Sequence, residues 1–188
     1  MKKLTPLFLL MLFLVIACGD DDDPTAPTGA SKDGAVLISG SDSNTEFDTF
    51  EFTVIPFFNW IIISAAESND TLSIFLFDYS SMEVNSAISL SDTSLWVIAT
   101  FGSGKHSAAN FGFSDNVSGS ITFTSLDTTG SIAATFSSGA TLDAANNTTG
   151  SVFTATIAGD FVATKAAGSA VAANIVRRNG ISRLLKRF

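Results

Sequence analysis

TFEFTV, residues 49–54, alternates apolar and polar side chains: Phe50, Phe52 and Val54 share one face. This period of two is typical of a β-strand with one buried face. The next two runs, Trp60–Ala66 and Thr71–Asp78, are apolar on both faces and are joined by the polar loop 67–70. They predict a hairpin of two central strands in an all-β domain.

The same strand pattern continues toward the C-terminus. Leu95–Phe101 predicts another strand, which the sequence Gly102-Ser103-Gly104 ends. Three more strands are expected, with turns at 127–130 and 144–150 and a bulge at Gly159; they are Ser118–Ser125, Ser131–Ser137 and Val152–Thr164. About eight short strands separated by polar turns predict an antiparallel β-sandwich over residues 34–165, with a β-barrel as the alternative.

The closing strands also carry a family resemblance. The segments GSITFTSLDTTGSIAATF and VFTATIAGDFVAT, residues 119–136 and 152–164, resemble the end of an all-β domain of unknown function in bacterial envelope lipoproteins. Residues that fit its pattern are Gly119, Ile121, Phe123, Thr135, Phe136, Gly159 and Phe161, whereas Ala134 and Ala158 depart from it. The resemblance implies a β-sandwich on a lipid tether and brings no activity and no functional residue.

The N-terminus has the build of a secretory signal peptide. Lys2 and Lys3 precede the unbroken apolar run Leu7–Ala17, which is shorter than the roughly 20 residues of a membrane span. The run ends in VIACG, residues 15–19, which resembles the lipobox of bacterial lipoproteins. The resemblance implies removal of residues 1–17 by cleavage between Ala17 and Cys18, and acyl chains on Cys18 that anchor the chain in a membrane. The alternatives are an ordinary signal peptide and an N-terminal membrane helix.

Residues 18–33 are expected to form a tether between the lipid and the domain. Asp20–Asp23 repel one another and do not fold, and the rest is rich in Pro, Thr, Gly and Ala. The run is either a solvated spacer or a surface-export signal, because acidic residues after the lipidated cysteine resemble such signals in some outer-membrane lipoproteins.

Residues 166–188 form an alanine-rich and then basic tail. Four apolar side chains recur there at the spacing i, i+3, i+4, i+7, namely Ile181, Leu184, Leu185 and Phe188. This spacing predicts a short amphipathic C-terminal helix. The tail either lies on anionic lipid, docks on the acidic domain, or is frayed.

Composition argues against several classes of function. The chain has 18 acidic and 10 basic residues, two of the latter in the signal peptide, so a nucleic-acid partner is not expected. His106 is the single histidine and is expected in a solvated loop. Zinc sites use several His or Cys ligands, which this chain lacks. The G-x-S-x-G motif of a hydrolase nucleophile elbow is absent from the sequence. No metal, no cofactor and no catalytic residue is therefore predicted.

Trp60 and Trp96 are the remaining candidates for ligand contact. Both lie in apolar runs, which favours burial, but exposed tryptophans could stack on sugar rings. The expected function is non-enzymatic: a lipid-anchored envelope protein, in the outer membrane or at the cell surface, that binds an envelope partner or has a structural role. The alternatives are a module for a glycan or a hydrophobic ligand, with a cavity of about 300–1,000 Å³, and, less favoured, a hydrolase.

Overall fold

β-Strands make up nearly all regular structure in residues 33–110 and 116–167, which the computed structural model describes. The expected all-β class is confirmed. Two 3-10 turns, η1 (Pro56–Phe58) and η2 (Tyr79–Ser81), are the exceptions among these residues. The strands are β1 (Val36–Ser39), β2 (Asn44–Phe47), β3 (Phe50–Ile55), β4 (Trp60–Glu67), β5 (Asp70–Phe77), β6 (Ala87–Ser89), β7 (Leu95–Phe101), β8 (His106–Asn110), β9 (Ser120–Leu126), β10 (Ser131–Asn146) and β11 (Val152–Lys165).

Three predictions fall on residues outside the described ones. They are the signal peptide with its cleavage site Ala17–Cys18, nearly all of the tether, and the C-terminal helix.

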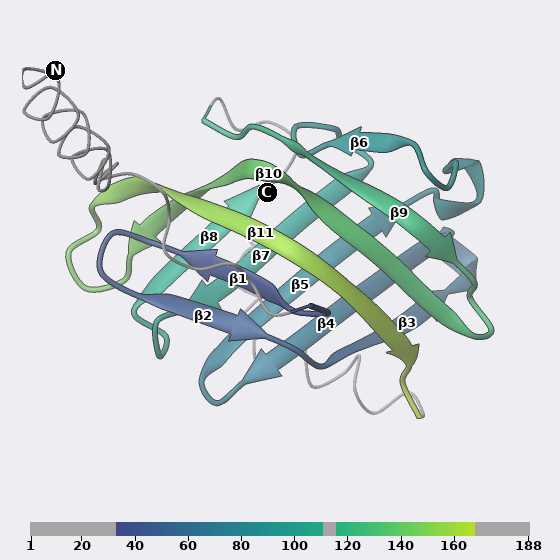
Figure 1. The fold of residues 1–188 in the computed structure, drawn as a ribbon, viewed down its shortest axis with the longest axis horizontal. Coiled ribbons are helices and arrows are strands. Elements are labelled where there is room, and N and C mark those ends of the chain that lie inside the picture. Colours follow the sequence, from purple (N-terminus) through teal and green to yellow (C-terminus); the bar gives the residue numbers. More distant parts are fainter. Residues whose placement is uncertain (1–32, 111–115, 168–188) are drawn as a thin grey trace, which may run out of the picture. The chain divides into compact units, whose positions relative to one another are not determined.

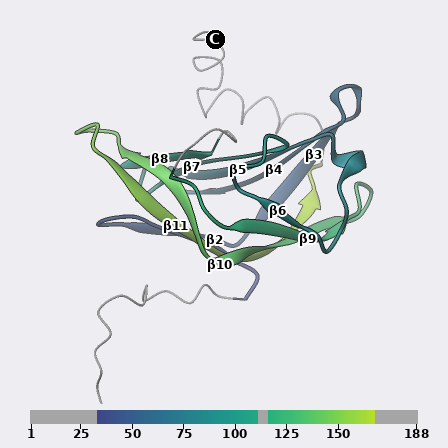
Figure 2. The same ribbon diagram turned by 90° about the horizontal axis from the view of Figure 1, so that it is seen from above.

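The strands form one 11-stranded sheet in the order β2-β1-β11-β3-β4-β5-β7-β8-β10-β9-β6 (Figure 1). Neighbouring strands are antiparallel except β11 and β3, which run parallel from the pair Ala163–Phe50 to the pair Lys165–Phe52. β11 also pairs with β1 and with β10. Figure 2 shows β3, β4, β5, β7 and β8 together in one layer, facing β2, β9, β10 and β11.

The core lies between these two groups of strands and is built largely from phenylalanine. The pattern predicted for residues 49–54 is confirmed at Phe50 and Phe52, which are both buried. Phe50 stacks on Phe161 of β11 with ring centroids 4.6 Å apart. The largest fully buried rings are Phe47, Phe52, Phe101, Phe123 and Phe161.

The predicted hairpin is confirmed, with β4 and β5 paired from Trp60–Phe77 to Glu67–Asp70. The strand predicted at 131–137 was too short, because β10 continues to Asn146, past the start of the predicted turn at 144. A bulge was expected at Gly159 of β11. The register instead shifts on the partner strand β10, between Phe136, which pairs with Gly159, and Ala140. Gly139 adopts φ +76° there, a conformation that glycine reaches without steric cost, so β10 bends and then resumes pairing.

Candidate binding surface and the buried histidine cluster

Five aromatic side chains form a continuous row: three on the outward face of β4, β5 and β7, and two on the 3-10 turn η1 that precedes β4. Trp60 and Phe77 are direct cross-strand partners, with ring centroids 5.1 Å apart and planes at 83°. Phe77 meets Trp96 edge to face at 4.8 Å, and Phe58 stacks on Trp60 at 4.9 Å. Phe57 completes the row through an edge contact with Phe58 at 5.0 Å. We call these five residues the aromatic row.

One end of the row is open to solvent. Phe57 is 90% exposed and Phe58 is 53% exposed, whereas Trp60, Phe77 and Trp96 are half-buried. We call Phe57 and Phe58 the aromatic tip. A large apolar ring that remains in water is a feature of interaction sites when it belongs to a contiguous patch.

The chain holds the aromatic tip in a defined turn. Pro56 begins the 3-10 turn, and Asn59 ends it in the left-handed region at φ 55°, which asparagine tolerates better than most residues. The side-chain amide of Asn59 donates to Asp78 and, at 2.7 Å, to Ser80. The tip is thus fastened to the β5–η2 connection, so its rings are presented on a fixed backbone.

The structure brings the two predicted ligand-contact residues onto the same outward face. Trp60 and Trp96 both contact Phe77, and neither belongs to the buried core cluster. Apolar runs on both faces of β4 and β5 favour buried tryptophans, but both tryptophans are half-buried on the outward face. Phe57 and Phe58 were not predicted as site residues, although Pro56-Phe57-Phe58 between two strands signals a turn that carries exposed aromatics.

His106 is fully buried, which corrects the expectation of a solvated loop histidine. The turn Gly102-Ser103-Gly104 has three successive residues with positive φ, so β8 begins at His106 and its side chain points into the domain. The imidazole lies between Phe101 and Phe153, with centroid distances of 5.1 and 5.0 Å.

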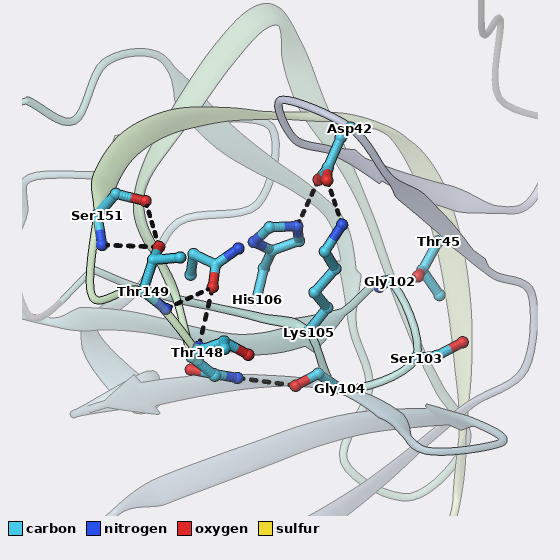
Figure 3. A network of polar contacts seen from close by, with 12 residues as sticks. Asp42, Thr45, Gly102, Ser103, Gly104, Lys105, His106, Thr148, Thr149 and Ser151 are labelled. Atoms are coloured by element: carbon cyan, nitrogen blue, oxygen red, sulfur yellow. Dashed lines mark hydrogen bonds and ion pairs between the residues drawn. The ribbon is translucent and has the colours of Figure 1, made fainter.

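Asp42 covers the outer edge of this imidazole. Its Oδ1 lies 2.8 Å from His106 Nε2, and its other oxygen pairs with the Lys105 amine (Figure 3). The hydrogen bond from Lys105 and then that from His106 lower the pKa of the Asp42 carboxyl below its usual 3.8. His106 Nδ1 has no hydrogen-bond partner among the described residues. Since two phenyl rings enclose the imidazole, the contacts support a role in fixing the loop around Asp42 against the β7–β8 turn.

Asp70 stabilises the β7–β8 turn through hydrogen bonds to its backbone. Its buried carboxylate accepts hydrogen bonds from Thr45 Oγ1 at 2.7 Å, from the Ser103 N–H at 2.9 Å and from the Gly104 N–H at 2.6 Å. Successive N–H groups in such a turn form a concavity that binds anions. Here the chain fills that concavity with its own carboxylate, so the turn is a structural device.

A groove of about 510 Å³ opens beside the aromatic tip. It lies between β3, the 3-10 turns and the end of β11, and Lys165 is the basic group on its wall. Its lining residues are Phe52, Thr53, Val54, Pro56, Tyr79, Thr128, Thr129, Lys165 and Ala166.

Residues 33–110 and 116–167 contain no group of three or more His, Cys, Asp or Glu side chains that could hold a metal ion. They also contain no helix that is long and apolar enough to cross a membrane.

Comparisons with known proteins supply no relative from which a role could be transferred. No protein-family model, no curated protein and no solved structure matches this chain.

Proposed function

We propose that this chain is an exported, lipid-anchored envelope protein whose β-domain binds an apolar surface of a partner protein through the aromatic tip, without catalysing a reaction. The observation that carries the proposal is the exposure of Phe57 and Phe58, 90% and 53%, on a turn that Asn59 fastens in place. Aromatic side chains that are ordered before binding lose little conformational entropy in the complex. They are also the residues that dominate the binding energy of protein interfaces.

The geometry of the aromatic row favours a protein partner over a glycan. Sugar rings stack on the open face of an aromatic ring, but Phe58 already stacks against Trp60 at 4.9 Å. Phe77 turns its plane by 83° from Trp60 and by 74° from Trp96. Such interlocked rings present a ridge that packs into another apolar surface and offer no flat platform for a sugar.

The proposed anchor is the lipid on Cys18, which rests on the resemblance of residues 15–19 to a lipobox. Residues 18–33 allow the domain to stand up to about 55 Å from the membrane at full extension. The described residues contain thirteen acidic and two basic side chains. This charge opposes close contact of the domain with anionic lipid and favours a partner protein as the occupant of the aromatic tip.

We also infer that the sheet closes on itself as a barrel, in preference to a sandwich of two separate sheets. The strand pairings support this: they run from β3 through β4, β5, β7, β8 and β10 to β11, and β11 pairs with β3 again. A closed sheet leaves fewer free edges, and it holds the aromatic tip on a rigid support.

A second candidate function is binding of a hydrophobic ligand that carries an acidic group. The groove beside the aromatic tip supports it, because its 510 Å³ volume and mixed lining match a small-molecule site and Lys165 could pair with the acid. In that case a fatty acid should bind the purified domain, and Lys165→Gln should weaken binding. Binding that is unchanged by Lys165→Gln would place the ligand elsewhere.

Site-specific photo-cross-linking in cells tests the leading proposal. A photoreactive phenylalanine analogue is placed at Phe58, and in a matched control at Val162, an exposed apolar residue of β11. The proposal predicts one dominant protein adduct from position 58 that is absent from position 162. Equal labelling from both positions, or adducts to lipid alone, would contradict it.

A further inference from the structure

The centre of the outward face of β4 and β5 is buried, although no other described strand lies over it. Ile62 and Ser73 point away from the core, and they are 6% and 1% exposed. By contrast, Val162 points outward from β11 and is 57% exposed. Figure 2 shows β2, β9, β10 and β11 on the opposite side of the layer that contains β4 and β5.

The shape of this face suits a covering segment. Across the strands, Ser64 pairs with Ser73, and Ser73 pairs with Ile98, which makes a row of mostly small side chains. The next row, Ile62–Phe75–Trp96, is large and apolar. A row of mostly small side chains beside a row of large apolar ones suits a helix laid across the strands. We call these two rows the covered face.

The end of β11 directs the chain toward this face. β11 runs parallel to β3, and its last pair joins Lys165 to Phe52. The Ala166 N–H then bonds to the Phe52 carbonyl at 2.9 Å. The chain thus leaves the sheet beside β3, next to β4, and heads toward the end where Ile55 pairs with Trp60. Residues 168–188 would reach about 30 Å as a helix, whereas three strand spacings measure about 15 Å.

Charge and pattern also fit the tail to the domain. Residues 168–188 carry five basic side chains and no acidic one, whereas the described residues carry a net charge of −11. Glu51 lies at the β3 end of the small-residue row, paired with Ser64. The acidic N-terminal tether is a poor alternative occupant because its carboxylates would be repelled. Residues 111–115 follow β8 directly and precede the segment that leads to β9, so both of their ends are fixed on the far side of β7 from β4, and five residues cannot reach Ile62 of β4 and return.

We propose that the C-terminal tail, residues 168–188, docks on the covered face, with its apolar side chains over the Ile62–Phe75–Trp96 row and its basic side chains toward Glu51. The tail then completes the domain and leaves the aromatic tip as the open apolar surface. This inference does not depend on the lipid at Cys18.

Disulfide trapping tests the docking in the chain with Cys18→Ala, which removes the native thiol. Ser73→Cys is combined with a cysteine at each apolar tail position in turn, that is Ile181, Leu184, Leu185 or Phe188. Ser182→Cys, predicted to lie on the polar side of the helix, is the matched tail control. Thr135→Cys, on exposed β10, is the matched domain control.

The proposal predicts that at least one apolar tail position forms an intramolecular disulfide with position 73 severalfold faster than either control. Disulfide-linked dimers from the same pairs would assign the face to a second copy and overturn the proposal. The absence of a preferred disulfide at all four positions would overturn it as well.

Tryptophan quenching gives a second readout that needs no cysteine. Both tryptophans of the chain, Trp60 and Trp96, lie on this side of the sheet. Replacing the four apolar tail residues by serine should increase quenching by acrylamide, whereas Arg183→Gln with Lys186→Gln should change it less. Far-ultraviolet circular dichroism confirms that each variant keeps its β-structure. Equal quenching of the wild-type and serine chains would overturn the proposal.

Discussion

Trp60 of β4 and Phe77 of β5 face each other across the hairpin, and their rings meet edge to face at 5.1 Å. Phe77 makes the same kind of contact with Trp96 of β7 at 4.8 Å. One phenyl ring thus joins three strands on the outward face and supports the aromatic tip from behind.

Phe77→Leu should weaken this support without removing the apolar side chain. Edge-to-face pairs contribute about 0.5–1.5 kcal/mol each beyond their buried area, so the loss of two pairs should lower the free energy of unfolding by about 1–3 kcal/mol. Urea unfolding followed by circular dichroism measures the change. Val162→Ala, on the exposed face of β11, should change stability by less than about 0.5 kcal/mol. Equal effects of the two substitutions would show that the rings gain nothing from their geometry.

Asp70→Ala should destabilise the β7–β8 turn. The buried carboxylate accepts hydrogen bonds from Thr45, Ser103 and Gly104, and its removal leaves these donors without their partner. The expected loss is about 3 kcal/mol in the free energy of unfolding, since each unsatisfied buried group costs about 1–3 kcal/mol. Asp70→Asn keeps one acceptor oxygen and should cost less. An Asp70→Ala variant as stable as the parent chain would contradict the role of this carboxylate.

Phe161→Ala should test the contact between β11 and β3. Phe161 is buried and stacks on Phe50 at 4.6 Å, so truncation should lower the free energy of unfolding by about 3–5 kcal/mol. The neighbouring exposed position gives the matched control, Val162→Ala. A small loss at position 161 would mean that this pair of strands adds little to the core.

The Asp42 carboxyl should show the effect of Lys105 directly. The hydrogen bond from Lys105 is the largest cause that lowers the pKa of Asp42 from 3.8, followed by that from His106. Lys105→Gln is expected to raise this pKa toward 3.8, and a carboxyl-detected NMR titration measures its midpoint. A midpoint that stays in place would show that the pair with Lys105 does not persist in solution.

The sign of the linked stability follows from the direction of that shift. A carboxyl whose pKa is lower in the folded chain adds stability that is complete above its unfolded pKa and is lost as the pH falls through its folded pKa. The contribution of Asp42 should therefore be complete above pH 3.8 and be lost progressively as the pH falls from 3.8 through the lower folded pKa. Asp42→Asn should reduce the pH dependence of the unfolding free energy in that acidic range alone.

The strands that could be predicted from the sequence are those whose pattern lies within a few neighbouring residues. The alternation at Phe50 and Phe52 and the polar link between β4 and β5 depend on neighbouring residues only, and both predictions are confirmed. The parallel pairing of β11 with β3 joins residues more than 100 positions apart, and no local pattern encodes it. The same holds for the second half of β10, where an apparent turn sequence continues as a strand because β8 and β11 flank it.

For the candidate functional residues, the sequence shows the residue type but not the neighbours in space. Trp60 and Trp96 were singled out by residue type, but only the register of β4, β5 and β7 places them around Phe77. The prediction of a solvated His106 is wrong because its Gly-Ser surroundings, typical of a solvated loop, do not show what packs on its ring. The burial of its ring depends on Phe153, which comes from β11, far away in the sequence.

A lipid tether on Cys18 would hold the domain at a membrane, and intact mass spectrometry detects such a tether on the chain itself. Membrane and soluble fractions are compared for cells that express the wild-type chain or Cys18→Ala. We expect a wild-type chain that begins at Cys18, carries added acyl mass and stays with the membrane, and a variant that lacks the acyl mass. An unacylated wild-type chain in the soluble fraction would rule out the lipid anchor.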